Sequence, residues 1–282
     1  MTTRDILLLV IALAAGACVG SFVNVVITRL PYRFDEPNEF GDLWGTHPWS
    51  VVAASESRCD GCGRDLTVVD LVPVLSWVAL RGRCRTCGDR IPAFHPLIEA
   101  LVPALGAFAW WRIGWGWQLA PVLWLIPAGV AISVIDLRAY IVPTRIVWPS
   151  FFVAAGLVVA GSLASHHPEW IVRSLIGLAA FAGPLFVLWF ILPAKMGFGD
   201  VRLTVLLGTV LGYSAGSIRP LGVVALVAIC LGLAAVVGIV VGVVAIGARG
   251  LKAKVPFGPS LVIATYVCCL YADSISRGFS LR

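Results

Sequence analysis

Residues 221–246 read LGVVALVAICLGLAAVVGIVVGVVAI, a long apolar run without a single charged side chain. A helix needs roughly 20 such residues to cross the hydrocarbon core of a bilayer, so this run predicts a transmembrane helix. Similar runs recur along almost the whole chain of 282 residues, of which 59% are hydrophobic and 13% are charged. An ordinary soluble domain has about 25% charged residues, so the composition excludes that class.

Eight stretches of the chain are predicted to form membrane-spanning helices. They are Ile6–Ile27, Leu97–Ile113, Leu119–Ile135, Ile146–Leu163, Ile171–Leu192, Val201–Ser217, Leu221–Ile246 and Phe257–Ala272. The first stretch is too long for a signal-peptide core and has no basic segment before it, so we expect it to be retained. The spacings of Gly16 with Gly20 and of Gly238 with Gly242 predict close approach of helix backbones. The predicted fold class is an all-α polytopic membrane protein.

Lysine and arginine are distributed unequally between the two sides that eight spans define. The side that holds segment 28–96 carries fifteen of the 21 Lys and Arg residues. By the positive-inside rule this side is cytosolic, and both termini lie outside. The same excess explains the net charge of +6. No basic face alternates with stacking aromatic residues, so the lipid bilayer is an expected partner and nucleic acid is not.

Segment 28–96 is the one sizeable polar region of the sequence, with nine of the fifteen acidic residues and four cysteines. Its part 31–57 mixes Pro, Gly, Asn and acidic residues without periodicity, so we expect irregular structure there. The predicted domains are a first transmembrane helix at 1–27, a small cytosolic loop domain at 28–96 and a transmembrane bundle at 97–282.

Two Cys-x-x-Cys pairs in this loop, Cys59 with Cys62 and Cys84 with Cys87, are separated by 21 residues. Each pair turns two thiolates toward one point, and together they predict a closed, structural zinc site with four thiolates. A glycine follows each pair and favours the tight turn that the pair needs. Disulfides or a redox motif are the alternative, but the charge distribution places the loop in a reducing compartment. The loop has few apolar residues, so zinc binding is expected to be coupled to its folding.

Asp136 and Asp200 are predicted to lie at the same membrane depth, because one ends a span and the other opens a span on the cytosolic side. A carboxylate within the bilayer costs on the order of 3 kcal/mol, so such acids are functional candidates. Two neighbouring carboxylates share a proton, and one can then act as a base on water while the other acts as an acid on a peptide carbonyl. The alternative is that each acid pairs with Arg138 or Arg202, or that Asp200 caps its helix.

Two other classes of protein could use the same features. The two acids of a proton- or cation-coupled transporter would relay protons or bind a cation. Transporters tend to have paired repeats and broken helices near the bilayer midplane, whereas these acids lie near one leaflet. In a zinc-clamped scaffold of a secretion apparatus without catalysis, only the cysteines would matter.

The sequence resembles a known family from its first predicted span to its last. The matching pieces are Gly20-Ser21-Phe22-Val23-Asn24-Val25-Val26 with Arg29-Leu30-Pro31, the two cysteine pairs, Leu80-Arg81-Gly82-Arg83-Cys84, His95-Pro96-Leu97-Ile98-Glu99, Asp136 followed by Ile141-Val142-Pro143, Gly197-Phe198-Gly199-Asp200-Val201-Arg202, and Pro256-Phe257-Gly258-Pro259. In this joint order they resemble the type IV prepilin peptidases, which belong with the preflagellin peptidases among the GxGD-type aspartyl proteases.

This resemblance implies an enzyme of the bacterial inner membrane. It would cleave the basic leader peptide from type IV prepilin or type II secretion pseudopilin precursors at the cytosolic face, with Asp136 and Asp200 as the catalytic pair. Members with a cysteine loop commonly then methylate the new N-terminal amine with S-adenosylmethionine, so segment 28–96 would be associated with methylation.

Further residues follow from the resemblance and from their positions. We expect Asn24 and Glu99, together with Gly197 and Gly199 of the Gly-x-Gly turn, to contact the substrate or the methyl donor. The sequence departs from the family at two positions. Thr144 stands where the family often has an aspartate, which affects secondary contacts, and Arg202 stands where lysine is usual, which retains the charge.

Overall fold

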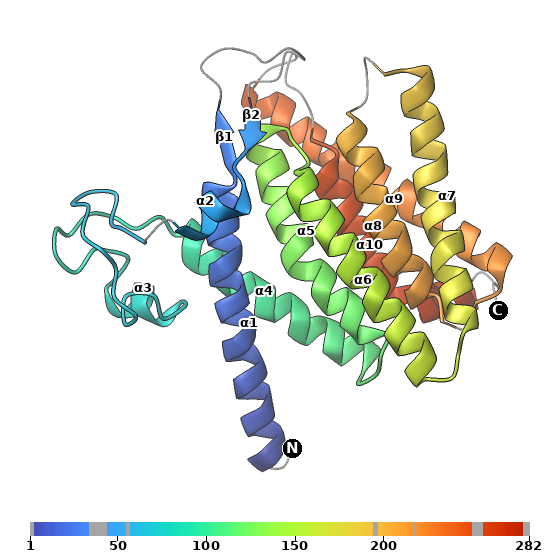
Figure 1. The fold of residues 1–282 in the computed structure, drawn as a ribbon, viewed down its shortest axis with the longest axis horizontal. Coiled ribbons are helices and arrows are strands. Elements are labelled where there is room, and N and C mark those ends of the chain that lie inside the picture. Colours follow the sequence, from blue (N-terminus) through green and yellow to red (C-terminus); the bar gives the residue numbers. More distant parts are fainter. Residues whose placement is uncertain are drawn as a thin grey trace. The chain divides into compact units, whose positions relative to one another are not determined.

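The computed structural model describes residues 3–33, 44–54, 57–193, 197–216, 218–249 and 256–278. The chain divides into two compact units, Met1–Phe108 and Ala109–Arg282. Figure 1 shows the helices that make up most of both units. A helix at each of the eight predicted positions confirms the all-α fold class.

The first unit consists of two long helices and the cysteine loop between them. Its elements are α1 (Thr3–Arg29), β1 (Pro31–Arg33), β2 (Trp44–Thr46), α2 (Trp49–Ala54), α3 (Leu75–Ala79) and the greater part of α4 (Phe94–Ile113). The two short strands pair antiparallel, with Tyr32 opposite Gly45. The prediction of irregular structure at 31–57 was therefore wrong for the described residues, because strand pairing is set by a partner distant in sequence and not by local periodicity.

Helices α1 and α4 approach closely at two glycines of α1. A Cβ atom added to Gly16 would lie 2.8 Å from the Cβ of Pro103, and one added to Gly20 would lie 2.8 Å from the Cα of Glu99. Such distances leave no room for a side chain, so the close approach predicted for Gly16 and Gly20 is confirmed.

The second unit is a bundle of six helices, in which five surround the buried sixth. Its helices are α5 (Leu119–Ala139), α6 (Thr144–Ala164), α7 (Glu169–Ile191), α8 (Phe198–Ser214), α9 (Pro220–Arg249) and α10 (Gly258–Gly278). Helix α8 contacts the other five helices, and nearly all its residues from Val201 to Tyr213 are buried. Figure 1 shows α5, α6, α8 and α10 running alongside one another. The outer helix α7 exposes Phe186 and Phe190, as a lipid-facing helix does.

Six helices of the described residues are long and apolar enough to cross a membrane: α1, α5, α6, α7, α9 and α10. Helix α8 has 17 residues, and at that length it spans about 25 Å, less than the hydrocarbon core of about 30 Å. Helix α4 has 20 residues but carries Glu99 and Arg112, which lower its mean hydropathy. The protein is thus a multi-pass membrane protein, and the count of eight spans stays a prediction.

Helices α7 and α8 pack backbone against backbone at three glycines. A Cβ atom added to Gly177 would lie 2.5 Å from the carbonyl oxygen of Gly208 and 2.7 Å from the Cα of Gly212. Beside them, the Ser174 hydroxyl donates a hydrogen bond to the Thr209 carbonyl at 2.8 Å. Small residues and interhelical hydrogen bonds drive association of helices in lipid, so this contact holds the buried helix in place.

Replacement of Gly177 by alanine is therefore expected to destabilise the bundle by about 1–3 kcal/mol, because the added methyl group forces α7 and α8 apart. Unfolding of the purified protein in mixed micelles by increasing denaturant measures this change. Gly183→Ala is the matched control, since Gly183 lies on the same helix with no atom within 4 Å of an added Cβ. Equal stability of the two variants would contradict the packing role of Gly177.

Candidate active site and metal centre

Asp136 lies in the last turn of α5 and is almost fully buried, with 4% of its surface exposed. Its Oδ2 accepts a hydrogen bond from the backbone N–H of Gly258 at 3.0 Å, at the first residue of α10. A Cβ atom added to Gly258 would lie 2.7 Å from this oxygen, so only glycine lets the backbone come so close. A buried carboxylate needs such a donor, and here the donor is an uncharged main-chain group.

Asp200 lies in the first turn of α8 and is half-buried. Helix α8 contacts both α5, which holds Asp136, and α10, whose first residue binds Asp136, so the two predicted acids lie on helices that pack together. Gly199 lets this turn pack against the segment after α5, since an added Cβ would lie 2.9 Å from the Cβ of Val142. Among the described residues, a Cβ atom added to Gly197 would meet only the Gly199 nitrogen, at 4.0 Å.

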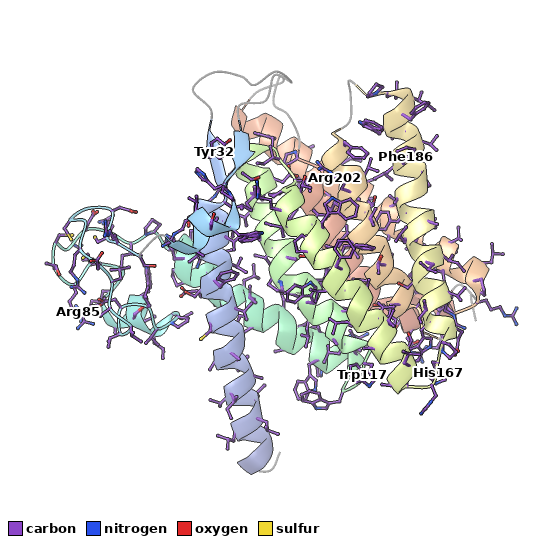
Figure 2. The ribbon with its side chains drawn as sticks, viewed as in Figure 1. Tyr32, Arg85, Trp117, His167, Phe186 and Arg202 are labelled. Carbon is purple, nitrogen blue, oxygen red and sulfur yellow. The ribbon has the colours of Figure 1, made fainter. Side chains whose placement is uncertain are left out.

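The two positions at which the sequence departs from the family contact each other. The Nη1 group of Arg202 donates a hydrogen bond to the Thr144 hydroxyl, which joins α8 to the first residue of α6. The guanidinium also lies 5.3 Å from the ring centre of Phe198. Figure 2 shows Arg202 among the helices of the second unit. Arg202 thus binds a neutral hydroxyl at the position where the family often has an aspartate.

The four cysteines of the loop converge on one point in the first unit. The sulfur atoms of Cys59, Cys62, Cys84 and Cys87 all lie within 4.8 Å of one another, and those of Cys59 and Cys87 are 3.7 Å apart. Four thiolates around a zinc ion at a Zn–S distance of about 2.3 Å have sulfur atoms about 3.8 Å apart, so this arrangement fits a tetrahedral zinc ion.

The two cysteine pairs share the same turn geometry. In each, the glycine after the second cysteine has a positive φ, 69° at Gly63 and 73° at Gly88, and its N–H bonds to the carbonyl of the first cysteine. These are the tight turns that the sequence predicted. Hydrogen bonds from the backbone N–H groups of Cys87 and Thr86 lower the pKa of the Cys84 thiol to about 6, whereas, against a hydrogen bond from the Asp89 backbone, burial and the neighbouring thiols raise the pKa of Cys87 to about 12.

Asp70 links the two cysteine pairs, a role that no motif in the sequence indicated. Its carboxylate accepts hydrogen bonds from Arg64, which follows the first pair, and from Arg85 within the second pair at 3.1 Å. The Thr67 hydroxyl, which also donates to it, is the largest cause that lowers the pKa of Asp70. Only 5% of the Asp70 side chain is exposed. Figure 2 labels Arg85 on this loop.

A cavity of about 480 Å³ lies within the first unit, beside Asn24 and Glu99. Its walls come from α1, the cysteine loop and the beginning of α4. Asn24 donates a hydrogen bond from its Nδ2 to the carbonyl of His95 at 2.9 Å, so it links α1 to α4. Glu99 accepts a hydrogen bond from the backbone N–H of Val74 at 2.7 Å. The structure therefore places Asn24 and Glu99, two of the four residues predicted to contact the substrate or the methyl donor, at one cavity, whereas Gly197 and Gly199 belong to the second unit.

The two parts of the chain match two described protein families. Residues 14–113 match the Bacterial Peptidase A24 N-terminal domain, and residues 123–271 match the Type IV leader peptidase family. The first match ends and the second begins close to the boundary between the two structural units, at residues 108 and 109.

Several bacterial proteins named prepilin leader peptidase/N-methyltransferase are similar to the chain over most of its length. The protein of Stutzerimonas stutzeri is 30% identical over 285 residues, which cover 95% of this chain and 92% of that protein. That of Aeromonas hydrophila is 31% identical over 286 residues, 93% and 90% of the two chains. That of Xanthomonas campestris pv. campestris is 31% identical over 283 residues, 95% and 93% of the two chains. No solved structure matches the chain.

Replacement of Gly258 by alanine is expected to lower the thermal unfolding midpoint of the purified protein. The added methyl group would overlap the Asp136 carboxylate, and the resulting shift costs about 1–3 kcal/mol. Gly278→Ala serves as the control on the same helix, because an added Cβ there has no atom of the described residues within 4 Å. If Gly258→Ala unfolded at the same temperature as the control, the contact between Asp136 and the start of α10 would not stabilise the fold, and the prediction would be wrong.

Proposed function

Because the chain belongs to the type IV leader peptidase family, we propose that it is a membrane aspartyl endopeptidase that removes the leader peptide from type IV prepilin or pseudopilin precursors. The observation that carries the proposal is the placement of Asp136, buried at the end of α5, and of Asp200, at the start of α8, where Gly199 packs against Val142 in the segment after α5. The relatives named as prepilin leader peptidases support the same activity.

The two aspartates divide the chemistry of peptide hydrolysis between them. One carboxylate takes a proton from the attacking water, while the other carboxyl group donates its proton to the oxygen of the scissile carbonyl. The pair shares one proton and acts as a unit, so neither aspartate has a fixed role. The Gly258 N–H orients the Asp136 carboxylate without neutralising its charge, and Gly197 leaves room for the extended backbone of the substrate.

The new N-terminus is then methylated, as the second half of the relatives' name supports. S-adenosylmethionine supplies the methyl group. The cavity beside Asn24 and Glu99 lies within the range of sizes of small-molecule sites and is lined by polar side chains, so the residues of the first unit fit such a donor. The site of cleavage lies at the cytosolic face of the bacterial inner membrane, as the positive-inside rule favours.

A zinc ion holds the cysteine loop together in this proposal. Cys59, Cys62, Cys84 and Cys87 provide a closed set of four thiolates, which suits structural zinc and leaves no position open for catalysis. The ion-paired Asp70 supports the same loop from outside the metal site.

The comparisons give no support to the alternative of a transporter. Both family matches are to peptidase families, and the similar proteins are named as peptidases.

Replacement of Asp136 or of Asp200 by asparagine is expected to reduce leader cleavage at least about 100-fold, because each variant removes one acid–base group. The assay incubates each purified protein with a synthetic leader-bearing precursor and reads the product masses. Asp273→Asn, at the far end of α10, is the control and retains cleavage. Full cleavage by either active-site variant would remove that residue from the mechanism.

Joint replacement of Cys84 and Cys87 by serine is expected to reduce bound zinc from about one ion per chain to near zero, because two of four ligands are lost. Elemental analysis of the purified protein measures the zinc, and limited proteolysis reports whether the loop loses its fold. Cys18→Ser, an exposed thiol of α1 outside the cluster, is the control and retains zinc. Full zinc content in the double variant would rule out this metal site.

A further inference from the structure

The cavity of the first unit contains a buried acceptor without a partner. Asn24 is 5% exposed and lines the cavity, and its Oδ1 has no hydrogen-bond partner among the described residues. Its Nδ2 is already used by the His95 carbonyl. A buried amide oxygen without a donor is unfavourable, so its place on a cavity wall favours a ligand that brings an N–H or O–H group.

Glu99 presents a carboxylate to the same cavity in a fixed orientation. Its Oε2 accepts a hydrogen bond from the Val74 N–H at 2.7 Å, and Val74 has φ 60° and ψ −48°. A β-branched residue rarely adopts a positive φ, and such strain persists where the surrounding structure enforces it, commonly at ligand sites. The backbone N–H thus holds one oxygen of Glu99 but leaves its negative charge in place.

Most of the positive charges around the cavity bind other groups, but Arg90, which also lines it, forms no salt bridge among the described residues. Arg64 and Arg85 both bind Asp70, and Arg29 donates hydrogen bonds to the Val52 carbonyl and the Ser57 hydroxyl. Glu99 forms no salt bridge within the described part of the chain. Its carboxylate, which a backbone N–H holds in place, is therefore a group on this wall that suits a cationic ligand, beside the lining acids Asp60 and Asp89.

Trp77 provides a fixed aromatic wall. Its indole N–H donates a hydrogen bond to the Ile91 carbonyl at 3.1 Å. Gly82, with φ 68°, lies against the ring, since an added Cβ would be 2.8 Å from the Trp77 Cζ2 atom. A ring held in this way offers a flat apolar surface to a planar base.

We propose that this cavity is the binding site of the methyl donor, with the Glu99 carboxylate beside the sulfonium, Trp77 against the adenine and Asn24 accepting a hydrogen bond from the donor. The assignment rests on the methylation half of the proposed function. In the transfer, the lone pair of the unprotonated N-terminal amine forms the new N–C bond while the S–C bond breaks, its electron pair stays on sulfur, and the product amine later loses a proton to water. Glu99 therefore favours the cationic donor over its neutral thioether product.

Isothermal titration of the purified, zinc-loaded protein with S-adenosylmethionine and with S-adenosylhomocysteine tests the site. The two ligands share the adenosine and amino-acid parts, but only the first carries a positive sulfur. The wild-type protein is expected to bind the first more tightly. Glu99→Gln, which retains an acceptor for the Val74 N–H, is expected to weaken binding of S-adenosylmethionine by about tenfold and to change that of the homocysteine compound by less than about twofold.

Two further variants and one control complete the design. Trp77→Leu and Asn24→Ala are expected to weaken both ligands, because their contacts do not depend on the charge of sulfur. Glu169→Gln makes the same chemical change at an exposed position of the second unit and is expected to leave both affinities as they are. Zinc content, measured for every variant, shows whether the loop has kept its fold.

Equal wild-type affinity for the two ligands, or equal weakening of both by Glu99→Gln, would overturn the placement of the sulfonium beside Glu99. Unchanged affinity in Trp77→Leu and Asn24→Ala would overturn the assignment of the cavity. If the wild-type protein bound neither ligand, the donor site and the methylation half of the function would both fail. Leader cleavage by the same preparation then decides the peptidase separately.

Discussion

The hydrogen bond between the Gly258 N–H and the Asp136 carboxylate constrains the whole second unit. A carboxylate that is 4% exposed at the end of an apolar helix requires a donor, and the donor here is the first residue of another helix. The end of α5 and the start of α10 must therefore meet. Helix α8 contacts both α5 and α10, and Asp200 lies in its first turn. Helix α8 can lie inside the bundle only because the glycines of α7 and α8 let the two backbones come close together.

The cysteine loop is held by a different kind of interaction. It buries few apolar side chains, and Val68 and Leu75 are among those it leaves exposed. Its order comes from polar groups, namely the four converging thiols and the buried carboxylate of Asp70 between two arginines. Metal binding and folding are coupled in domains of this kind, so the walls of the adjoining cavity depend on the metal site.

Much of the architecture could be predicted from the sequence, because apolar runs and Cys-x-x-Cys spacing are local signals. All eight predicted stretches are helices, and the four cysteines converge as their spacing indicated. The strand pair of β1 and β2 and the role of Asp70 were missed, since both depend on partners distant in sequence. A signal for the α7–α8 contact was present in the spacing of Gly208 and Gly212, but their partner on α7 follows only from the fold. The contact between Thr144 and Arg202 likewise needed the structure, although both positions stood out in the sequence.

Each unit orients an important carboxylate with a backbone N–H group and not with a charged side chain. In each, a carboxylate has one oxygen fixed by a main-chain N–H: Asp136, in the last turn of α5, by that of Gly258, and Glu99, in the second turn of α4, by that of Val74. An arginine would orient a carboxylate as well, but its charge would stabilise the ionised form and occupy the group that the chemistry needs. A backbone donor fixes the position and leaves the charge available. Such a donor has a conformational cost at the residue that provides it. Gly258 cannot be replaced by a residue with a side chain, and Val74 adopts an unfavourable positive φ.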